Sequence, residues 1–202
     1  GHTEYLLQSF NSHNNCLMFL CSDNIKVATL TNHIPVSQIA KHITSSLVKD
    51  KIEILLDSLR NDFLLSNPRI AVLGLNPHAG DSGLMGLEDM RVIEPTINAF
   101  FNLGELVYGP YSSDAFFGAG IYKNFDAVLG MYHDQALIPF KLLSFGSGVN
   151  YTAGLPAIRV SPDHGVAYDI AGLGEADPNS LVSSIYLAIK IFNNRLNFFK
   201  KR

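Results

Sequence analysis

The stretch IAVLGLNPHAGDSGLMGLEDMRVIEPTINAFFNLG, residues 70–104, decides the fold class of this chain. Residues 70–75 form a compact apolar run that is typical of a buried strand. A glycine-rich loop follows, and residues 88–103 then resume a helical period that Gly104 can end. Strand, glycine-rich loop and helix in this order are typical of an α/β protein that binds its ligand at the carboxyl ends of parallel strands. We therefore expect an α/β fold with its functional site at that edge of the sheet.

A second stretch, AVLGMYHDQALIPFKLLSFGSGVNYTAGLPAIRVSPDHGVAYDIAG (residues 127–172), carries most of the side chains that suggest chemistry. It opens with an apolar run ending at His133 and Asp134, as expected where a buried strand delivers polar side chains to a sheet edge. Lys141, Asn150 and Arg159 follow, each isolated among apolar or glycine-rich neighbours. Lone cations and amides are costly to bury, so these side chains are predicted to converge on an anionic ligand. For any one of them, a surface position explains the pattern equally well.

Three of the seven histidines occupy the same kind of position. His33, His78 and His133 each follow a predicted strand by a few residues, so all three can meet at one edge of a parallel sheet. Three neutral imidazoles leave a divalent ion with open coordination positions, which suits Zn²⁺, Co²⁺ or a similar metal acting as a Lewis acid. Taken singly, each histidine is more often structural, and the chain contains no HxxxH or CxxC motif. The repeated placement is what favours a metal site.

The composition indicates a globular protein. With 202 residues, of which 47% are hydrophobic and 16% charged, the chain is expected to fold around a sizeable core. A net charge of −3, with a basic cluster only at residues 200–202, argues against a nucleic-acid partner. No apolar run approaches the roughly 18 residues that cross a bilayer, and no leader-like segment opens the chain, so we expect a soluble, cytoplasmic protein. Cys16 and Cys21 are expected to be reduced core residues on opposite faces of one strand.

The remaining elements complete the predicted α/β framework. Two strands, residues 16–22 and 25–30, are separated by a turn at residues 23–24. Apolar residues at helical spacing predict a core helix with the stripe Val48, Ile52, Leu55, Leu59 and Phe63. A closing helix is predicted behind Pro178, with one apolar face formed by Leu181, Ile185, Ala188, Phe192, Leu196 and Phe199. Composition marks no internal domain boundary. We interpret residues 1–202 as a metal- and substrate-binding α/β region that comprises one complete domain and part of a second.

Four motifs occur in the order of a known family: GHTE (residues 1–4), NPHAGDSGLMG (76–86), MYHDQ (131–135) and GVNYTAGLPAIRVSPDHG (148–165). Together they resemble the 4-hydroxythreonine-4-phosphate dehydrogenases, NAD-dependent enzymes of pyridoxal phosphate synthesis. The likeness runs from residue 1 to about residue 190 and covers the C-terminal three-fifths or so of the family's usual length. Asp81 and Ser82 stand where the family often has Glu and Gly, and VAYD (166–169) replaces a more usual TALE-like run.

The resemblance implies a fold, an assembly and cofactors. The family is similar in fold to the isocitrate and isopropylmalate dehydrogenases, with two α/β domains around a cleft, and this chain would lack an N-terminal segment of that fold. A homodimer whose active sites use both subunits is implied as well. So are NAD or NADP and a divalent metal, Zn, Co or Mg.

Individual residues match the family's functional positions. His33, His78 and His133 match its three metal-binding histidines, which come from both partners. The matches to its substrate-binding residues are His2, Thr3, Lys141, Asn150 and Arg159. The loop DHGVAYDIAGLGEADP (163–178) resembles the one that holds the adenosine part of NAD in the wider superfamily, which gives His164 and Asp169 cofactor roles.

These matches lead to a hypothesis for the reaction. NAD-dependent oxidation of 4-phosphooxy-L-threonine would be followed by decarboxylation to 3-amino-2-oxopropyl phosphate, with the metal as Lewis acid. Lys141 and Arg159 suit a phosphate or carboxylate, and Asp114 and Asp134 suit steadying the histidines or relaying protons. Two alternatives stay open. One is a dehydrogenase of a four-carbon sugar-acid phosphate, such as erythronate or threonate 4-phosphate; the other is a truncated, non-catalytic dimerising module that binds ligand.

Overall fold

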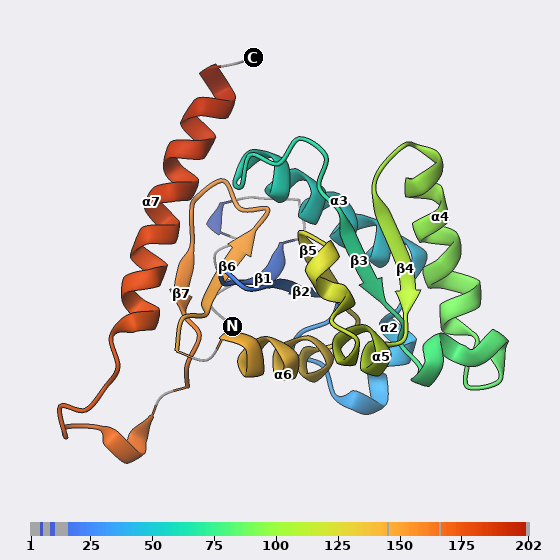
Figure 1. Ribbon diagram of the computed structural model, residues 1–202, viewed down its shortest axis with the longest axis horizontal. Coiled ribbons are helices and arrows are strands. Elements are labelled where there is room, and N and C mark those ends of the chain that lie inside the picture. Colours follow the sequence, from blue (N-terminus) through green and yellow to red (C-terminus); the bar gives the residue numbers. More distant parts are fainter. Residues whose placement is uncertain (1–4, 6–8, 11–15, 145, 166, 201–202) are drawn as a thin grey trace.

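A seven-stranded mixed sheet forms the centre of the computed structural model, which describes residues 5, 9–10, 16–144, 146–165 and 167–200 (Figure 1). Its strands lie in the order β4-β3-β5-β2-β1-β6-β7. Their bounds are β1 Leu17–Cys21, β2 Lys26–Thr29, β3 Ile70–Leu73, β4 Val107–Tyr111, β5 Ala127–Gly130, β6 Val149–Ala153 and β7 Val160–Pro162. The strands predicted at residues 16–22, 25–30 and 70–75 correspond to β1, β2 and β3, each slightly shorter than the apolar run that predicted it.

The direction of the strands divides the sheet into two parts. β4, β3, β5 and β2 are mutually parallel, whereas β1 is antiparallel to both β2 and β6, and β7 is antiparallel to β6. β2, β3 and β5 therefore end at one edge of the sheet, here called the carboxyl edge. The start of β6 lies at the other edge, because Val149 pairs with Cys21, which in turn pairs with Lys26 at the start of β2. We call this second edge the amino edge.

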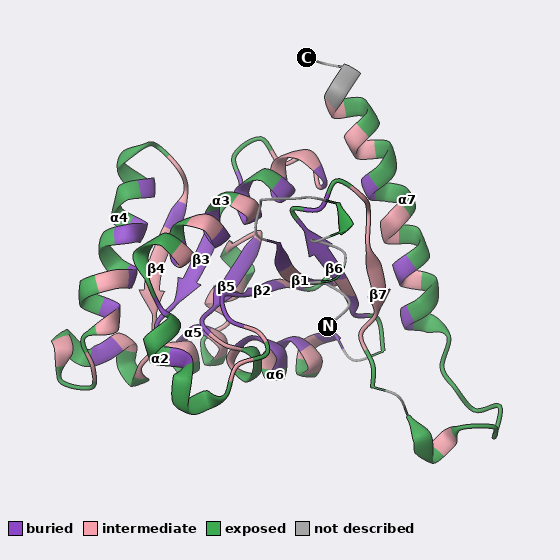
Figure 2. Ribbon diagram, turned by 180° about the vertical axis from the view of Figure 1, so that it is seen from behind, coloured by how far each residue is buried: buried purple, intermediate pink, exposed green. Residues whose placement is uncertain are grey.

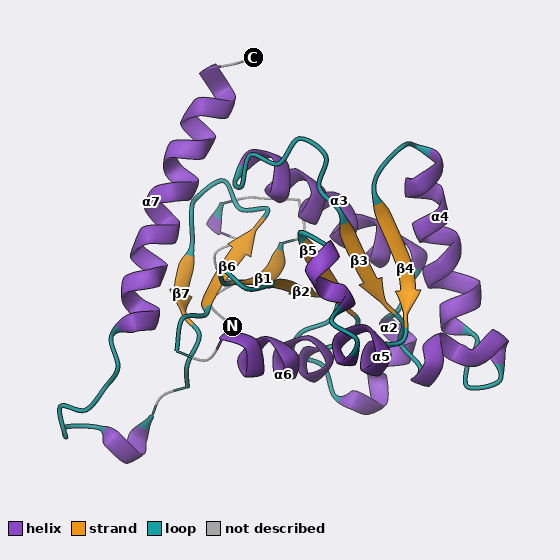
Figure 3. Ribbon diagram, in the orientation of Figure 1, coloured by secondary structure: helices purple, strands orange, loops and turns teal. Residues whose placement is uncertain are grey.

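Helices cover both faces of the sheet (Figure 3). The α-helices are α2 Ile39–His42, α3 Ser45–Asn61, α4 Glu94–Asn102, α5 Ser113–Gly118, α6 His133–Ser144 and α7 Asn179–Lys200. Shorter helical turns are η1 Val36–Gln38, η2 Pro77–Gly83, η3 Asp89–Ile93, η4 Ile121–Asn124 and η5 Tyr168–Ile170. One apolar core packs α3, α4 and α7 against the sheet, and a second packs α5 and α6 against the opposite face.

Helix α3 on the first face forms as its sequence predicts. The Thr44 side chain accepts a hydrogen bond from the Leu47 amide at 3.2 Å and so caps the first turn. The predicted stripe from Val48 to Leu59 is fully buried. Phe63 lies beyond the end of the helix at Asn61, but it still packs against the same core.

The apolar face predicted for the closing helix is not turned toward the core. Leu181, Ile185, Phe192 and Leu196 are 44–56% exposed, and α7 instead packs through Ser180, Ser184 and Ile191 (Figure 2). Helical spacing identified the apolar stripe, but spacing alone cannot say whether the body of the same chain covers it.

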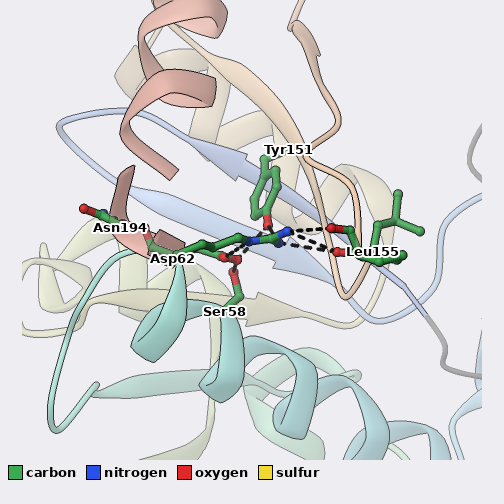
Figure 4. Close-up of polar contacts among 7 residues, drawn as sticks. Ser58, Asp62, Tyr151, Leu155 and Asn194 are labelled. Carbon is green, nitrogen blue, oxygen red and sulfur yellow. Dashed lines mark hydrogen bonds and ion pairs between the residues drawn. The ribbon is translucent and has the colours of Figure 1, made fainter. Parts of the chain in front are cut away.

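A buried polar cluster ties α7 to the rest of the molecule (Figure 4). The Asp62 carboxylate, just past α3, accepts hydrogen bonds from Ser58 Oγ at 2.7 Å, Tyr151 Oη at 2.6 Å and Arg195 Nε at 2.7 Å. Asn194 Nδ2 donates to the Asp62 carbonyl at 2.7 Å. Burial, together with the neighbouring Asp62 carboxylate, raises the pKa of Tyr151. Burial, the largest single influence, would lower the pKa of Arg195, but the hydrogen bonds and charges of Asp62 and Tyr151 together outweigh it and raise that pKa.

The two cysteines match their prediction. Cys16 and Cys21 are buried and form no disulfide, and burial raises the pKa of the Cys21 thiol, so the unreactive protonated form is favoured. Among the described residues, no helix is both long and apolar enough to cross a membrane.

Candidate functional site at the carboxyl edge

The three histidines singled out by their spacing lie at the carboxyl edge, as predicted. His33 follows β2, His78 lies in η2 after β3, and His133 begins α6 directly after β5. These three strands are neighbours in the order β3-β5-β2. The segments after β2 and β5 stay together beyond the sheet, because the Thr31 amide donates to the Met131 carbonyl at 3.2 Å. All three histidines are exposed.

The imidazoles of one chain do not form a complete metal site. Within the part of the chain that the structure describes, no three His, Cys, Asp or Glu side chains are close enough together to hold an ion. The donor chemistry nevertheless fits a divalent metal, because the three histidines present exposed nitrogen ligands from adjacent strands.

The loop that carries His78 adopts an unusual backbone. His78, Ala79, Asp81 and Ser82 have φ values between 42° and 55°, and Gly80 has a φ of 83°. Each non-glycine residue in this left-handed region costs of order 1–3 kcal/mol, and such strain is concentrated at functional sites. Gly80 accepts this conformation readily because it has no side chain.

Two carboxylates predicted to steady the histidines lie beside them. His133 Nδ1 and Asp134 Oδ1 are 2.8 Å apart, and both side chains are exposed. Asp114 lies in the first turn of α5, after β4, and accepts a hydrogen bond from Ser112 Oγ at 2.6 Å. This hydrogen bond, with smaller contributions that include the positive charge of His78, lowers the pKa of Asp114. The hydrogen bond of Asp114 is therefore made to Ser112 rather than to a histidine.

Gln135 joins three of the loops at this edge, and the sequence reasoning missed it. Its Oε1 accepts from the Met131 amide at 2.6 Å, while Nε2 donates to the Gly74 carbonyl and to Ser113 Oγ, both at 2.7 Å. These partners follow β5, β3 and β4, respectively. Its place in the MYHDQ motif, two residues after His133, was the available signal.

Asn150 and Arg159, two of the predicted substrate-binding residues, lie on the face of the sheet that α6 covers. Asn150 pairs with Leu20, whose side chain packs in the α6 core, and Thr152 lies on the same face two residues later. Arg159 Nη1 donates to Thr152 Oγ1 at 3.3 Å. Asn150 Oδ1 is buried and has no hydrogen-bond partner among the described residues, which is unusual for a buried polar atom.

Lys141 is separated from the histidines of its own chain. It lies on α6 eight residues after His133, about 12 Å along a helix axis. Its Nζ contacts the Asp163 side chain at 3.1 Å and donates to the Asp163 carbonyl at 3.0 Å, beyond β7 at the amino edge. Lys141 therefore lies away from the histidines of its own chain, because α6 crosses the sheet and carries Lys141 to the other edge. The convergence of Lys141, Asn150 and Arg159 on one ligand stays a prediction.

A pocket lies next to Lys141 at the amino edge. It has a volume of about 270 Å³ and is lined by Lys141 and the end of α6, the segment between α6 and β6, the loop after β7 with Asp163 and His164, and the start of α7. Most of the lining residues are small or apolar. His164 is exposed, and its Nδ1 lies 2.9 Å from the Gly165 carbonyl. Asp169, the second predicted cofactor residue, is exposed in η5 and does not line the pocket. His2 and Thr3 lie outside the described residues.

A protein family model and several relatives match this chain over almost its whole length. The family model for "Pyridoxal phosphate biosynthetic protein PdxA" matches residues 1–188. A 4-hydroxythreonine-4-phosphate dehydrogenase of Bacteroides thetaiotaomicron is 50% identical over 195 residues, which is 96% of this chain and 54% of that protein. One of Prosthecochloris aestuarii is 43% identical, over 97% of this chain and 58% of that protein.

A solved structure agrees with these relatives. The crystal structure of the 4-hydroxythreonine-4-phosphate dehydrogenase from Klebsiella pneumoniae superposes with a TM-score of 0.82 at 41% identity, covering 95% of this chain and 57% of that one. The chain thus spans little more than half the length of the proteins it matches. The match over almost the whole chain, with the agreement in fold, shows that this chain belongs to the PdxA family of pyridoxal phosphate biosynthetic proteins.

Proposed function

We propose that this chain supplies the metal- and substrate-binding region of a homodimeric dehydrogenase in pyridoxal 5'-phosphate biosynthesis. The reaction would be NAD-dependent oxidation of 4-phosphooxy-L-threonine, followed by decarboxylation to 3-amino-2-oxopropyl phosphate. The observation that carries the proposal is the placement of His33, His78 and His133 at the ends of three adjacent parallel strands. The names of the relatives support the substrate.

The separation of Lys141 from the histidines supports an active site built from two subunits. A phosphorylated substrate at the carboxyl edge of one protomer is out of reach of that protomer's Lys141, which lies at the amino edge. In the proposed dimer, Lys141 of the second copy approaches the histidines of the first. This arrangement would also complete the coordination that one chain leaves open.

The residues of the chain have distinct proposed roles. Lys141 and Arg159 neutralise the phosphate and carboxylate of the substrate, and the unpaired Asn150 Oδ1 accepts a hydrogen bond from a substrate hydroxyl or ammonium group. Asp134 orients the ring of His133. When bound, the divalent ion, Zn²⁺, Co²⁺ or Mg²⁺, supplies Lewis-acid stabilisation of the negative charge that develops on the substrate.

The nicotinamide cofactor is assigned to the amino-edge pocket. Its mainly apolar lining suits an adenine ring, and His164 at its rim is the proposed contact to NAD or NADP. Asp169 lies outside the pocket lining, so its proposed cofactor role requires the loop that carries it to move toward the nucleotide. The two buried cysteines, which form no disulfide, accord with a cytoplasmic setting.

Metal binding and turnover test this proposal together. Titration of the metal-free chain with Co²⁺, followed by its visible absorption, should show binding that His78→Ala and His133→Ala abolish. His42→Ala, an exposed histidine on α2, is the matched control and should bind as the unmodified chain does. NADH formation should be faster with 4-phosphooxy-L-threonine than with erythronate 4-phosphate.

Each contrary result has a definite meaning. Unaltered Co²⁺ binding by His78→Ala and His133→Ala would refute the metal site. A preference for erythronate 4-phosphate would assign the sugar-acid substrate instead. Metal binding without NADH formation from either compound would identify a non-catalytic, ligand-binding module.

A further inference from the structure

Asp89 lies directly beneath the left-handed turn that carries His78. The side chain is buried, with 1% of the residue exposed, although it carries a carboxylate. A Cβ added to Gly74 would lie 2.9 Å from Asp89 Oδ1, and one added to Gly80 would lie 3.3 Å from Oδ2. The carboxylate therefore fills the space between the end of β3 and the turn.

The carboxylate fixes the backbone that leads into the turn. Oδ1 accepts a hydrogen bond from the Leu75 amide at 2.7 Å, and Oδ2 accepts from the Asn76 amide at 3.1 Å. Asn76 Nδ2 donates to the same Oδ2 at 2.9 Å and to Glu88 Oε2, also at 2.9 Å. His78 follows Asn76 by two residues, so these bonds set the direction from which its ring leaves the sheet.

The helix that begins at Asp89 is itself irregular. Residues Asp89–Ile93 form a π-helical turn ahead of the regular helix α4. Such π-turns are rare, and they occur frequently at functional sites. In the segment 78–82, the four non-glycine residues on either side of Gly80 all have positive φ values. Such strained conformations likewise persist only where the surrounding structure enforces them. Both irregular segments meet at the Asp89 carboxylate.

We propose that Asp89 is a positioning residue that holds the 77–83 turn so that His78 points at the metal. Asp89 does not itself bind the ion in this scheme; it acts through the Leu75 and Asn76 amides and through the Asn76 side chain. The inference rests on the proposed metal role of His78. It adds that the affinity for the metal depends on a buried carboxylate that follows His78 by eleven positions.

The test compares Asp89→Asn with His78→Ala in the full chain, using Co²⁺ as the probe. Asp89→Asn keeps the size of the side chain but replaces one acceptor oxygen with an amide group that faces N–H donors. We expect about a 10- to 100-fold loss of Co²⁺ affinity, the usual effect of altering a group that orients a metal ligand. At saturating Co²⁺ the spectrum should match that of the unmodified chain, because every ligand is still present.

Two further measurements separate positioning from loss of fold. In the metal-free protein, the Leu75 and Asn76 amides should exchange with solvent faster in Asp89→Asn, while circular dichroism stays unchanged. Asp57→Asn, which removes an exposed carboxylate on α3, is the matched control and should leave the affinity unaltered. If Asp89→Asn does not fold, Asn76→Ala serves in its place, with a several-fold loss of affinity expected.

The outcomes distinguish this inference from the proposal on which it rests. Co²⁺ affinity within twofold of the unmodified value in Asp89→Asn, or in Asn76→Ala where that variant replaces it, overturns the positioning role. If His78→Ala still loses binding, the metal site itself stands. Full binding by His78→Ala would overturn the metal role of His78 and the positioning role of Asp89 together.

Discussion

Replacing Arg195 with Met should destabilise the chain by about 3–5 kcal/mol, the usual cost of leaving one member of a buried ion pair without its partner. The side chain of Asp62 is only 4% exposed and that of Arg195 is 20% exposed, so water screens the pair poorly. The change removes the bond from Nε to Asp62 at 2.7 Å and the bond from Nη2 to Tyr151 Oη at 2.9 Å. Asp62 would keep two hydroxyl donors but no counter-charge.

Urea unfolding followed by far-ultraviolet circular dichroism measures this loss, since the chain has no Trp to report by fluorescence. Arg60→Met is the matched control, because Arg60 pairs with Glu105 in a more exposed bridge whose side chains are 34% and 25% accessible. Its loss should stay below about 1 kcal/mol. The double variant Asp62→Asn/Arg195→Met should be more stable than Arg195→Met, because it no longer buries a lone charge. An Arg195→Met variant no less stable than Arg60→Met would refute this reasoning.

Two more predictions concern Gln135 and Lys51. Gln135→Ala removes three hydrogen bonds that join the loops after β3, β4 and β5, and should lower the free energy of unfolding by about 1–3 kcal/mol in the same urea assay; an unchanged value would show that these bonds add nothing. Burial of Lys51, which is 8% exposed and donates to the Cys16 carbonyl, lowers its pKa from 10.5. The unfolded chain then binds the Lys51 proton more tightly, so this residue destabilises the fold below its folded pKa, and the penalty disappears as pH rises toward 10.5. Lys51→Met should lose that pH dependence, and an identical slope in both proteins, measured by urea unfolding from neutral to alkaline pH, would contradict it.

Local patterns predicted the placement of the histidines because each lies within a few residues of a strand that its own apolar run defines. The apolar runs before His78 and His133 are short and continuous, as is typical of buried parallel strands. They correspond to β3 and β5, respectively. The placement of the three histidines at the carboxyl edge could therefore be predicted from local sequence patterns, without knowledge of any long-range contact.

Features that depend on contacts between distant parts of the chain could not be predicted from the sequence. The left-handed turn at residues 78–82 is held by Asp89, and no local pattern shows which carboxylate lies beneath a loop. The contact of Lys141 with Asp163 at the amino edge depends on the antiparallel pairing of β6 and β7, which periodicity does not reveal. The exposed stripe on α7 was identified as apolar, but its surroundings are set by tertiary packing.

The course of helix α6 predicts how inactivating mutations combine in the proposed dimer. It begins with His133 at one border of the sheet and carries Lys141 to the other, so every protomer contributes a different half to each of two catalytic centres. Consider a mixed dimer in which one polypeptide carries an inactivating substitution at His133 and the other carries one at Lys141. One of its two centres then combines the intact His133 of one polypeptide with the intact Lys141 of the other. Two alleles that are each inactive alone would then complement one another when expressed in the same cell.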